Sequence, residues 1–562
     1  MTDRTRILRV DLTAGSVRSE AIPETWRERY LGGKGLGVRY LYEELSPDTD
    51  PLSPSNRLLV MFGPLTGLLP GEARYAAVTK SPLTGTFLDS YSGGSFPAVL
   101  AGSLPTHLGV LIEGQSNTPV TLHIDADTGT VRPAATWGKD SVETDRAYPE
   151  AAVAAIGPAG EHRVSFATIA SDGAEHHAGR GGAGAVMGAK RLKAIVARGD
   201  PPAPNGAIAA LHDRDTARYL DSPVGRWQSA SGTVETVDFA DETGVLATQG
   251  WQGASTDTSK IGIEAIRNAA VEREDPGPIP GDFRFEIESG HTVPRGATAM
   301  TLGAGLGISS LSDVVTLGDR CNRLGMDLID AGNAIALAIH AADTGRIDRS
   351  IEFGDASAAG ALLDAIAYRD DPLASLLADG VDAATRQLDL GSIVPTVKAM
   401  ALPAYDPRMD VGMALAYATS DRGGCHRRAR PIERTALDGE GDPADLVDHV
   451  IAEQNRRSLQ WSLVADDFVG ECIDPAEWLD TAGISSYRLS DAGERIWTLT
   501  RLFNVRSGFD RTTDRVPIPY EPETDDGPSL PPLLDRYYAE RGWDVRGIPT
   551  RETIDRLAID VD

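Results

Sequence analysis

The sequence predicts an α+β fold, in which a β-rich N-terminal part precedes two mostly helical parts. Residues 1–200 contain many short apolar runs separated by Gly and Pro turns, a pattern typical of antiparallel or mixed sheets. From about residue 206 to residue 400 the apolar positions follow helical spacing. At 562 residues the chain is also too long for one core, because a domain usually holds about 100–200 residues.

The expected elements follow one another in a simple order. Short strands are predicted at 6–12, 57–63, 75–80, 109–114, 119–125, 164–170 and 193–199. A helix is expected at 327–345, because Leu328, Ile335 and Ile339 share one apolar face, and the segment 356–370 has a similar pattern.

Pro-rich breaks separate these regions. One lies at 200–206 and another at 402–410, and such segments are typical of linkers and loops. We therefore expect three domains, at 1–203, 204–401 and 402–562.

The net charge of −28, with only seven lysines, indicates a strongly acidic surface. Such a surface suits a cytoplasm of high salt, where the Debye length falls to about 3 Å, although a solvated surface without a partner is the simpler reading. Acidity argues against nucleic acid, which requires a basic face. No apolar run approaches the ~20 residues that cross a bilayer, and the start has no apolar signal core. We expect a cytoplasmic protein without a membrane span.

The three cysteines, Cys321, Cys425 and Cys472, lie far apart in the sequence. This spacing excludes Cys-x-x-Cys redox and zinc motifs, and a disulfide framework is not expected. It also limits iron–sulfur chemistry, because a cubane cluster normally needs four thiolates.

Glycine-rich loops carry the strongest functional pattern. The stretch AGRGGAGAVMGAKRLK at 178–193 satisfies G-x-G-x-x-G. A Rossmann loop follows its strand directly, whereas here other residues intervene after the predicted strand, so a nicotinamide dehydrogenase is disfavoured. Bare amides favour an anion, and the alternative is a tight turn that packs one sheet on another. Further glycine-rich stretches at 31–42 and 63–97 favour one extended ligand with several phosphate-like groups.

A longer series of motifs extends this pattern along the chain. It includes RVDLTAG at 9–15, LGGKGLG at 31–37, TKSPLTG at 79–85, IGPAGE at 156–161, the loop at 178–193, LGMDLIDAG at 324–332 and YATSDRGGCH at 417–426. In order and spacing these motifs resemble the tungsten-dependent aldehyde ferredoxin oxidoreductase family. The resemblance implies an N-terminal β-sheet domain that forms a pterin-binding base, covered by two mostly helical domains.

The resemblance also implies a cofactor and a reaction. The family holds tungsten in two pyranopterins, whose phosphates are bridged by magnesium. It oxidises aldehydes to carboxylic acids and passes electrons through a 4Fe–4S cluster to ferredoxin.

The resemblance further implies a set of site residues. The cofactor-binding positions are Arg74, Tyr91, Gly93, His177, Ala178, Gly179, Arg180, Asn322, Gly325 and Asp327. Arg74 would contact phosphate, and the carbonyl of Tyr91 would face the magnesium. His177 replaces an arginine, so one donor replaces a fork of donors. Asp327 would accept from pterin amines or cap a helix, and His426 would handle protons near the metal.

The sequence departs from the family at the cluster and beside the metal. Glu274, Gly277, Gly281 and Asp466 stand at the four cluster positions, and none can supply a thiolate. Residues 294–298 read PRGAT where the family carries a glutamate. The resemblance implies a cluster, whereas these residues predict that it is absent.

Two hypotheses follow, because the chain keeps many motifs of the family but lacks the cluster cysteines and the glutamate beside the metal. The first is an oxidoreductase that acts on a small aldehyde at a tungsten or molybdenum bis-pyranopterin, with an altered electron route and no obvious need for ferredoxin. The second is a catalytically silent paralogue that binds a pterin or acts as a partner or carrier protein. The residues do not distinguish tungsten from molybdenum, and the resemblance allows a homodimer.

Overall fold

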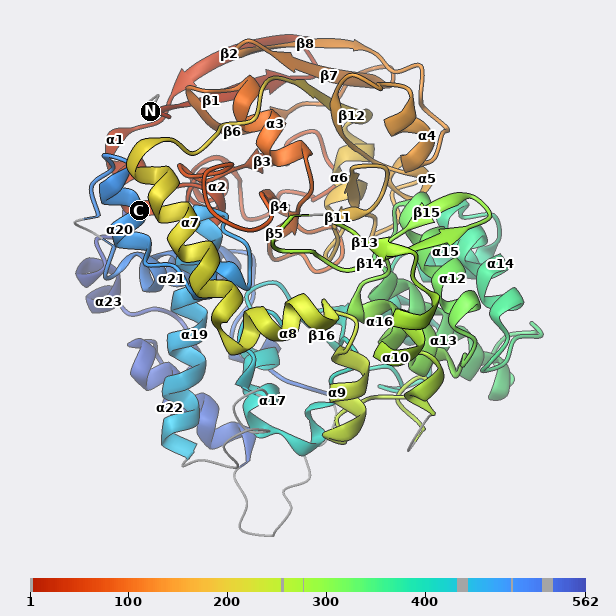
Figure 1. The fold of residues 1–562 in the computed structure, drawn as a ribbon. Helices are drawn as coiled ribbons and strands as arrows, with labels where there is room; N and C mark the ends of the chain where they lie inside the picture. The colour runs from red at the N-terminus through yellow and green to blue at the C-terminus, as the bar shows by residue number, and fades with distance from the viewer. Residues whose placement is uncertain are drawn as a thin grey trace.

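The computed structural model describes residues 4–253, 257–275, 277–431, 443–486, 489–517 and 529–561. Figure 1 shows the strands of the N-terminal part gathered at one end of the molecule, with the helices of the later parts beneath them. This arrangement confirms the predicted α+β fold, with sheets first and helices after.

The first sheet has six strands in the order β2-β1-β6-β3-β4-β5. Their bounds are β1 Arg6–Asp11, β2 Ser16–Ala21, β3 Leu58–Met61, β4 Tyr75–Lys80, β5 Phe87–Ser92 and β6 His107–Glu113. Strands β1 and β6 run parallel and the other pairs are antiparallel, as the prediction of mixed sheets allows. One face of this sheet packs on the helices α2 (Gly33–Glu44) and α21 (Ala492–Arg506).

The second sheet also has six strands, in the order β11-β10-β9-β12-β7-β8. Their bounds are β7 Val120–Asp125, β8 Thr128–Pro133, β9 Ala152–Ala155, β10 Ile169–Ser171, β11 His176–Ala178 and β12 Leu192–Arg198. Val60 and Val110 of the first sheet share one buried core with Leu122 and Ile195 of the second. The two sheets therefore pack face to face, because each turns one apolar side inward.

The predicted strand at 164–170 forms only in part, since β10 begins at Ile169. The earlier residues bond to the helical region instead. The amide of Ser165 donates to the carbonyl of Ala378, and the carbonyl of Phe166 accepts from the amide of Asp327. Phe166 is buried among helices, so its apolar pattern reflects a contact between the two regions and not a ladder.

The other helices fall into three groups along the chain. The first group is α1 Glu24–Tyr30, α3 Phe96–Ser103, α4 Ser141–Arg146, α5 Pro158–Glu161 and α6 Ala183–Ala189. The middle group is α7 Gly206–Asp221, α8 Pro223–Ser231, α9 Thr236–Glu242, α10 Ile263–Ala269, α11 Gly296–Thr298, α12 Leu311–Leu324, α13 Leu328–Asp343, α14 Ala356–Tyr368, α15 Pro372–Ala378 and α16 Val381–Leu388. The last group is α17 Val411–Thr419, α19 Pro443–Leu463, α20 Pro475–Thr481, α22 Leu530–Arg541 and α23 Arg551–Arg556.

Small elements complete the described chain. The short strands are β13 Glu272–Arg273, β14 Phe283–Ile287, β15 Gly290–Thr292, β16 Thr396–Val397 and β17 Met400–Ala401. The element η2, Ala299–Gly303, is a π-helical turn, and the other short turns are η1 Thr258–Lys260, η3 Ala304–Leu306, η4 Pro407–Met409, η5 Val469–Glu471 and η6 Arg511–Thr513. The predicted helices at 327–345 and 356–370 correspond to α13 and α14.

The first helix after the 200–206 break packs against the C-terminal part of the chain. Trp478 Nε1 of α20 donates to Asp215 Oδ2 of α7 at 2.8 Å, and Arg214 pairs with Glu477 at 2.7 Å. Figure 1 shows α7 running beside the C-terminal helices. The boundaries at 203 and 401 stay a prediction.

Among the described residues, no single helix has the length and apolar character needed to cross a membrane. One sharply bent pair, Gly296–Leu306 with Leu311–Leu324, meets the length and composition test when the two are taken together.

A buried charge cluster joins the first sheet to α2 and to the segment 421–428. Lys34 Nζ lies 3.3 Å from Asp89 Oδ2 and also pairs with Asp421, and the Lys34 and Asp89 side chains are fully buried. Arg428 Nε donates to Asp421 Oδ1 at 2.7 Å, and Arg428 also pairs with Asp89. Burial opposes ionisation, yet Arg428 and Lys34 lower the pKa of Asp89 to about 2.

The charge cluster generates a stability prediction. Lys34→Met leaves two buried carboxylates short of a cation, so we expect it to lower the free energy of unfolding by about 3–5 kcal/mol. Denaturant unfolding measures this loss. Arg226→Ala is the control, because the pair of Arg226 with Asp221 is exposed and should contribute only about 0–1 kcal/mol. Equal effects of the two substitutions would contradict the role given to Lys34.

Candidate functional site

A cavity of about 720 Å³ lies between the first sheet, the segment 293–301 and the segment 422–430. Most of the predicted site residues line it. These are Arg74, Tyr91, Gly93, His177, Gly179, Arg180, Asn322, Asp327 and His426. The structure thus gathers positions that are hundreds of residues apart in the sequence into one hollow.

The two other predicted residues, Ala178 and Gly325, do not line the cavity and pack within the fold. Ala178 belongs to β11 and is buried in the core between the sheets. Gly325 ends α12 with a φ of 76°, a left-handed conformation that favours glycine. A Cβ atom on Gly325 would lie 2.8 Å from the amide nitrogen of Gly157, so this glycine permits close packing.

The glycines of the 178–193 loop divide into two kinds. A Cβ on Gly179 would meet only Asp327 Oδ1 at 3.7 Å and His177 O at 4.0 Å, so its backbone is open to the cavity. A Cβ on Gly182 would come within 2.0 Å of the Ser165 carbonyl, and one on Gly184 within 2.2 Å of the Thr168 carbonyl. The reading of a tight packing turn therefore holds at Gly182 and Gly184, whereas anion binding at Gly179 stays a prediction.

The cations beside the glycine loops bind protein carbonyls and carboxylates. Lys190 Nζ donates to Asn56 O at 2.6 Å, and Lys193 Nζ donates to Ile156 O at 2.7 Å. Lys34 belongs to the buried cluster described above. Each of these amines satisfies buried acceptors of the fold, so a lysine beside a glycine-rich stretch does not by itself indicate a phosphate contact.

Arg180 joins the glycine loop to α13 and to the 401–424 region. Its Nε lies 3.1 Å from Asp327 Oδ2, and its Nη1 donates to Gly424 O at 2.9 Å. Asp327 Oδ2 also accepts from the amide of Asp330 at 3.1 Å, so Asp327 caps α13. Asp327 therefore caps a helix and lines the cavity at the same time.

His177 contributes a neutral ring to the wall. Burial lowers the pKa of His177 to about 4. With Ala174 O 3.0 Å from Nε2 and Thr168 Oγ1 2.8 Å from Nδ1, the ring donates to the carbonyl and accepts from the hydroxyl. The one N–H donor of His177, which stands where the family has an arginine, therefore already bonds to Ala174 O.

Arginines are crowded on the side of the cavity formed by residues 422–430. Burial, and then Arg74 and Arg430, lower the pKa of Arg427 to about 9. Within the described part of the chain, Arg422 Nε and Arg428 Nη1 are buried without hydrogen-bond partners, and both residues line the cavity. Crowded cations with unused donors fit a polyanion, because phosphate oxygens accept such bonds. The cavity therefore fits a cofactor with phosphate groups.

Two neighbours in the same segment are chemically distinct. Burial and Arg427 lower the pKa of His426 well below its usual value, so the ring is neutral. Its Nδ1 has no hydrogen-bond partner among the described residues, and its ring centre lies 5.4 Å from that of Tyr405. Burial favours the thiol of Cys425, but Arg422 and other arginines lower its pKa to about 7. Our sequence reasoning missed Cys425, although arginines at 422, 427 and 428 surround it in the sequence.

The residues at the predicted cluster positions lie within a network of ion pairs. His176 lies between two carboxylates, with Nδ1 2.7 Å from Glu72 Oε1 and Nε2 3.1 Å from Glu274 Oε1. Arg295 donates to both oxygens of Glu274 at 2.6 Å and lies 3.2 Å from Asp282 Oδ2. Glu274 is one of the predicted cluster positions and Arg295 lies in the segment 294–298, so the two predicted departures from the family contact each other.

The other cluster positions lie in the same neighbourhood. Arg74 bridges Glu72, at 2.9 Å, and Asp466, at 3.4 Å. A Cβ on Gly281 would lie 2.6 Å from Glu274 Oε2. Carboxylates, glycines, an imidazole and guanidinium groups do not fit a cubane cluster, which is held by thiolates.

Glu72, His176 and Glu274 also form a candidate metal-ligand group, since their ligand atoms lie within 4.8 Å of one another. Both ring nitrogens and both Glu274 oxygens already have partners. The carboxylates of this group are therefore already paired with two cations, protonated His176 and the guanidinium of Arg295.

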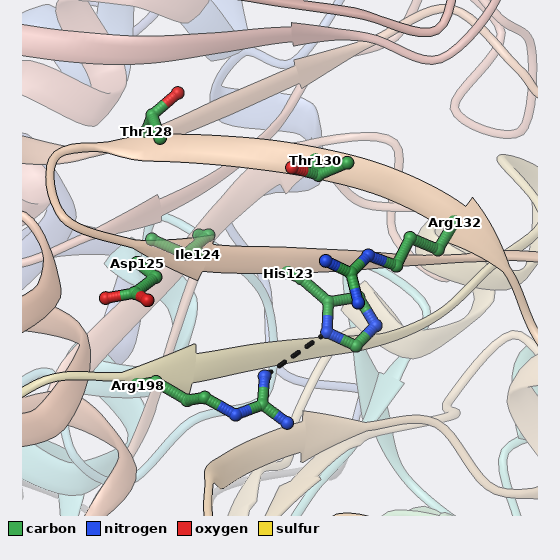
Figure 2. Close-up of a pocket in the computed structure, with 7 residues that line it drawn as sticks. All are labelled: His123, Ile124, Asp125, Thr128, Thr130, Arg132 and Arg198. Carbon is green, nitrogen blue, oxygen red and sulfur yellow. Dashed lines mark hydrogen bonds between the residues drawn. The ribbon is translucent and has the colours of Figure 1, made fainter.

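Figure 2 shows a separate hollow of about 270 Å³ on the face of the second sheet turned away from the first. His123, Arg132 and Arg198 line it from three neighbouring strands, and Arg198 Nη1 lies 3.3 Å from His123 Nδ1. None of the predicted site residues lines this hollow.

Comparison with known proteins matches both ends of the chain to one family. The family model described as "Aldehyde ferredoxin oxidoreductase, N-terminal domain" matches residues 7–199, and the one for "domains 2 & 3" matches 211–559. The tungsten-containing aldehyde ferredoxin oxidoreductases of Thermococcus kodakarensis and Pyrococcus furiosus are each 32% identical, over 99% of this chain and 98% of the relative.

A second Pyrococcus furiosus protein, described as "Aliphatic sulfonate oxidoreductase, WOR-like subunit", is 26% identical over 99% of this chain and 96% of its own. Among solved structures, the active site complex BamBC of benzoyl coenzyme A reductase with 1,5-dienoyl-CoA aligns with a TM-score of 0.84. The alignment covers 99% of this chain and 97% of the BamBC chain at 24% identity, which supports the fold.

The ion-pair network predicts a pH-dependent stability. Burial favours neutral His176, but Glu72 and Glu274 raise its pKa to about 9, above the value of about 6.5 in an unfolded chain. The stabilisation from the imidazolium is complete below about pH 6.5 and is lost as the pH rises through 9. We therefore expect His176→Gln to lower the Tm most at pH 6 and much less at pH 10.

Thermal unfolding at the two pH values checks this prediction. His177→Gln is the matched control, because the lowered pKa of His177 gives a stability that rises slightly from pH 6 to pH 10, opposite in sign to the change expected for His176. A Tm difference for His176→Gln that is the same at pH 6 and pH 10 would show that the ring carries no proton.

Proposed function

Because the chain belongs to the aldehyde ferredoxin oxidoreductase family, we propose that it oxidises an aldehyde to a carboxylic acid at a tungsten or molybdenum bis-pyranopterin. The observation that carries the proposal is the cavity itself, where unused arginine donors and a neutral His426 line one hollow. The alternative of a silent, pterin-binding paralogue is less favoured, since relatives over the whole chain are oxidoreductases.

The arginines of the 422–430 segment are the proposed phosphate contacts. Arg422 Nε and Arg428 Nη1 offer unused donors, and an anion near Arg427, which already pairs with Asp467, would oppose the repulsion from Arg74 and Arg430. Gly179 leaves room for the ligand to approach the backbone. Magnesium bridging the cofactor phosphates stays a proposal, as does the carbonyl of Tyr91 as its ligand.

His426 is the proposed proton acceptor. Oxidation of an aldehyde with water gives a carboxylic acid, two electrons and two protons. The bound metal centre would supply a two-electron acceptor for this reaction. A neutral imidazole with an unused Nδ1 can take a proton from the water as it adds to the carbonyl carbon.

The electron route differs from the one that the resemblance implies. Glu274, Gly277, Gly281 and Asp466 provide no thiolate, and the chain's three cysteines are too few for a cubane cluster. We propose that no 4Fe–4S cluster is bound, so the electron acceptor need not be ferredoxin.

Metal analysis of the purified native protein tests the cofactor and the missing cluster together. We expect tungsten or molybdenum at about one atom per chain and iron far below the roughly four atoms of a cubane, with no cubane absorbance. Four iron atoms per chain would refute the lost cluster, and the lack of both heavier metals would favour the silent paralogue.

A substitution tests the role of His426. We expect His426→Asn to lower kcat/KM for aldehyde-dependent dye reduction by about 10²–10⁴-fold, because a base is removed while the metal content stays the same. His212→Asn on α7 is the control, since that side chain is partly exposed beside Asp213. Full activity of His426→Asn would remove His426 from the mechanism.

A further inference from the structure

Thr301 lines the cavity and carries a hydroxyl without a hydrogen-bond partner among the described residues. Its Oγ1 is buried, and the residue is only 5% exposed. Thr301 lines the cavity together with its neighbour Met300. A buried polar group without a partner costs free energy, and a ligand bound in the cavity would supply the missing partner.

Other hydroxyls in the wall differ from Thr301 because they are engaged. Thr168 Oγ1 bonds to His177 at 2.8 Å, Thr233 Oγ1 donates to Asp282 at 2.8 Å, and Thr236 Oγ1 donates to Thr233 O at 2.8 Å. These bonds fix the wall and leave no donor for a ligand.

Thr301 lies in an unusual stretch of backbone. Some threonines in the α-helices of this chain donate to the carbonyl four residues earlier, as Thr419 does to Leu415 at 2.8 Å and Thr500 does to Ile496 at 2.8 Å. Thr301 instead lies in the π-helical turn η2, where the wider backbone changes this geometry. Such turns often occur at functional positions.

The walls that carry Thr301 and His426 meet along α13. Gly332 of α13 packs on the π-helical turn, since a Cβ there would lie 2.5 Å from Thr301 Cγ2. Asn333 Nδ2, one residue later, donates to Leu402 O at 3.2 Å. Residues 403–405 line the cavity next to His426, so the two unused groups belong to adjoining walls.

The rest of the wall near Thr301 is apolar. Phe239, Met300 and Trp227 line the cavity, and Trp227 lies edge-on to Phe468 at 6.5 Å between ring centres. Arg295, the nearby cation, is already bonded to Glu274 and Asp282. The wall therefore combines the Thr301 hydroxyl with apolar side chains, and the Arg295 guanidinium is already paired.

We propose that Thr301 orients the substrate by donating its hydroxyl proton to the aldehyde oxygen, and that the substrate is an aldehyde with an apolar body, such as an aromatic ring. This inference rests on the proposed aldehyde oxidation. The hydrogen bond fixes the carbonyl, while Trp227, Phe239 and Met300 cover the body of the molecule.

The test compares two substitutions at the same position in the metal-loaded protein. Thr301→Val removes the hydroxyl and keeps the shape, whereas Thr301→Ser keeps the hydroxyl. With benzaldehyde we expect Thr301→Val to raise KM by about 3- to 10-fold with little change in kcat, and Thr301→Ser to resemble the wild type. Removing an unpaired hydroxyl should not unfold the protein.

Thr248→Val is the matched control. Thr248 is also buried, and its Oγ1 also has no partner in the described part of the chain, but it lies outside the lining of the cavity. We expect its KM for benzaldehyde to equal that of the wild type. An unchanged KM in Thr301→Val, or an equal rise in Thr301→Ser, would overturn the proposal.

Binding of acetophenone separates this inference from the proposed function. This ketone keeps the carbonyl and the ring but cannot be oxidised to an acid, and calorimetry measures its Kd. We expect Thr301→Val to weaken binding by about 3- to 10-fold. If no aldehyde is oxidised but this loss appears, the proposed reaction fails while the role of Thr301 stands. If the Kd is unchanged, the role of Thr301 fails.

Discussion

Charges in the interior must be paired, and the pairing of Lys34 and Arg428 with Asp89 and Asp421 holds the cavity together. These residues come from α2, from β5 and from the segment before α19. Their ion pairs place the 422–430 segment against the first sheet. The buried charge cluster therefore helps to fix the segment that carries the arginines, Cys425 and His426 to the cavity.

The sequence predicted the order of layers well because local patterns determine it. The strand runs, the apolar face of α13 and the Pro-rich breaks are properties of neighbouring residues. The run at 164–170 misled the prediction in part, since Phe166 is apolar for contact with helices and not for a strand. A pattern shows that a residue is buried, but it does not show against which element.

The set of site residues followed from the family resemblance, and the roles of single residues were harder to predict. The resemblance implied that Arg74, His426 and the other site residues form one site, and most of them line one cavity in the structure. The resemblance did not show that Lys34 and Lys190 turn inward to protein acceptors, or that Gly182 and Gly184 are needed for packing. Side-chain direction depends on distant segments, which the sequence does not reveal.

The ion-pair network limits which single substitutions it tolerates. An uncharged residue at position 274 would remove one of the two carboxylates that pair with His176 and one of the two that pair with Arg295, and a glutamate at 295 would face Glu274 and Asp282. Each of these single substitutions is therefore opposed by electrostatics. The residues of the network are energetically coupled, so a change at one of them is best accommodated by a matching change at its partner.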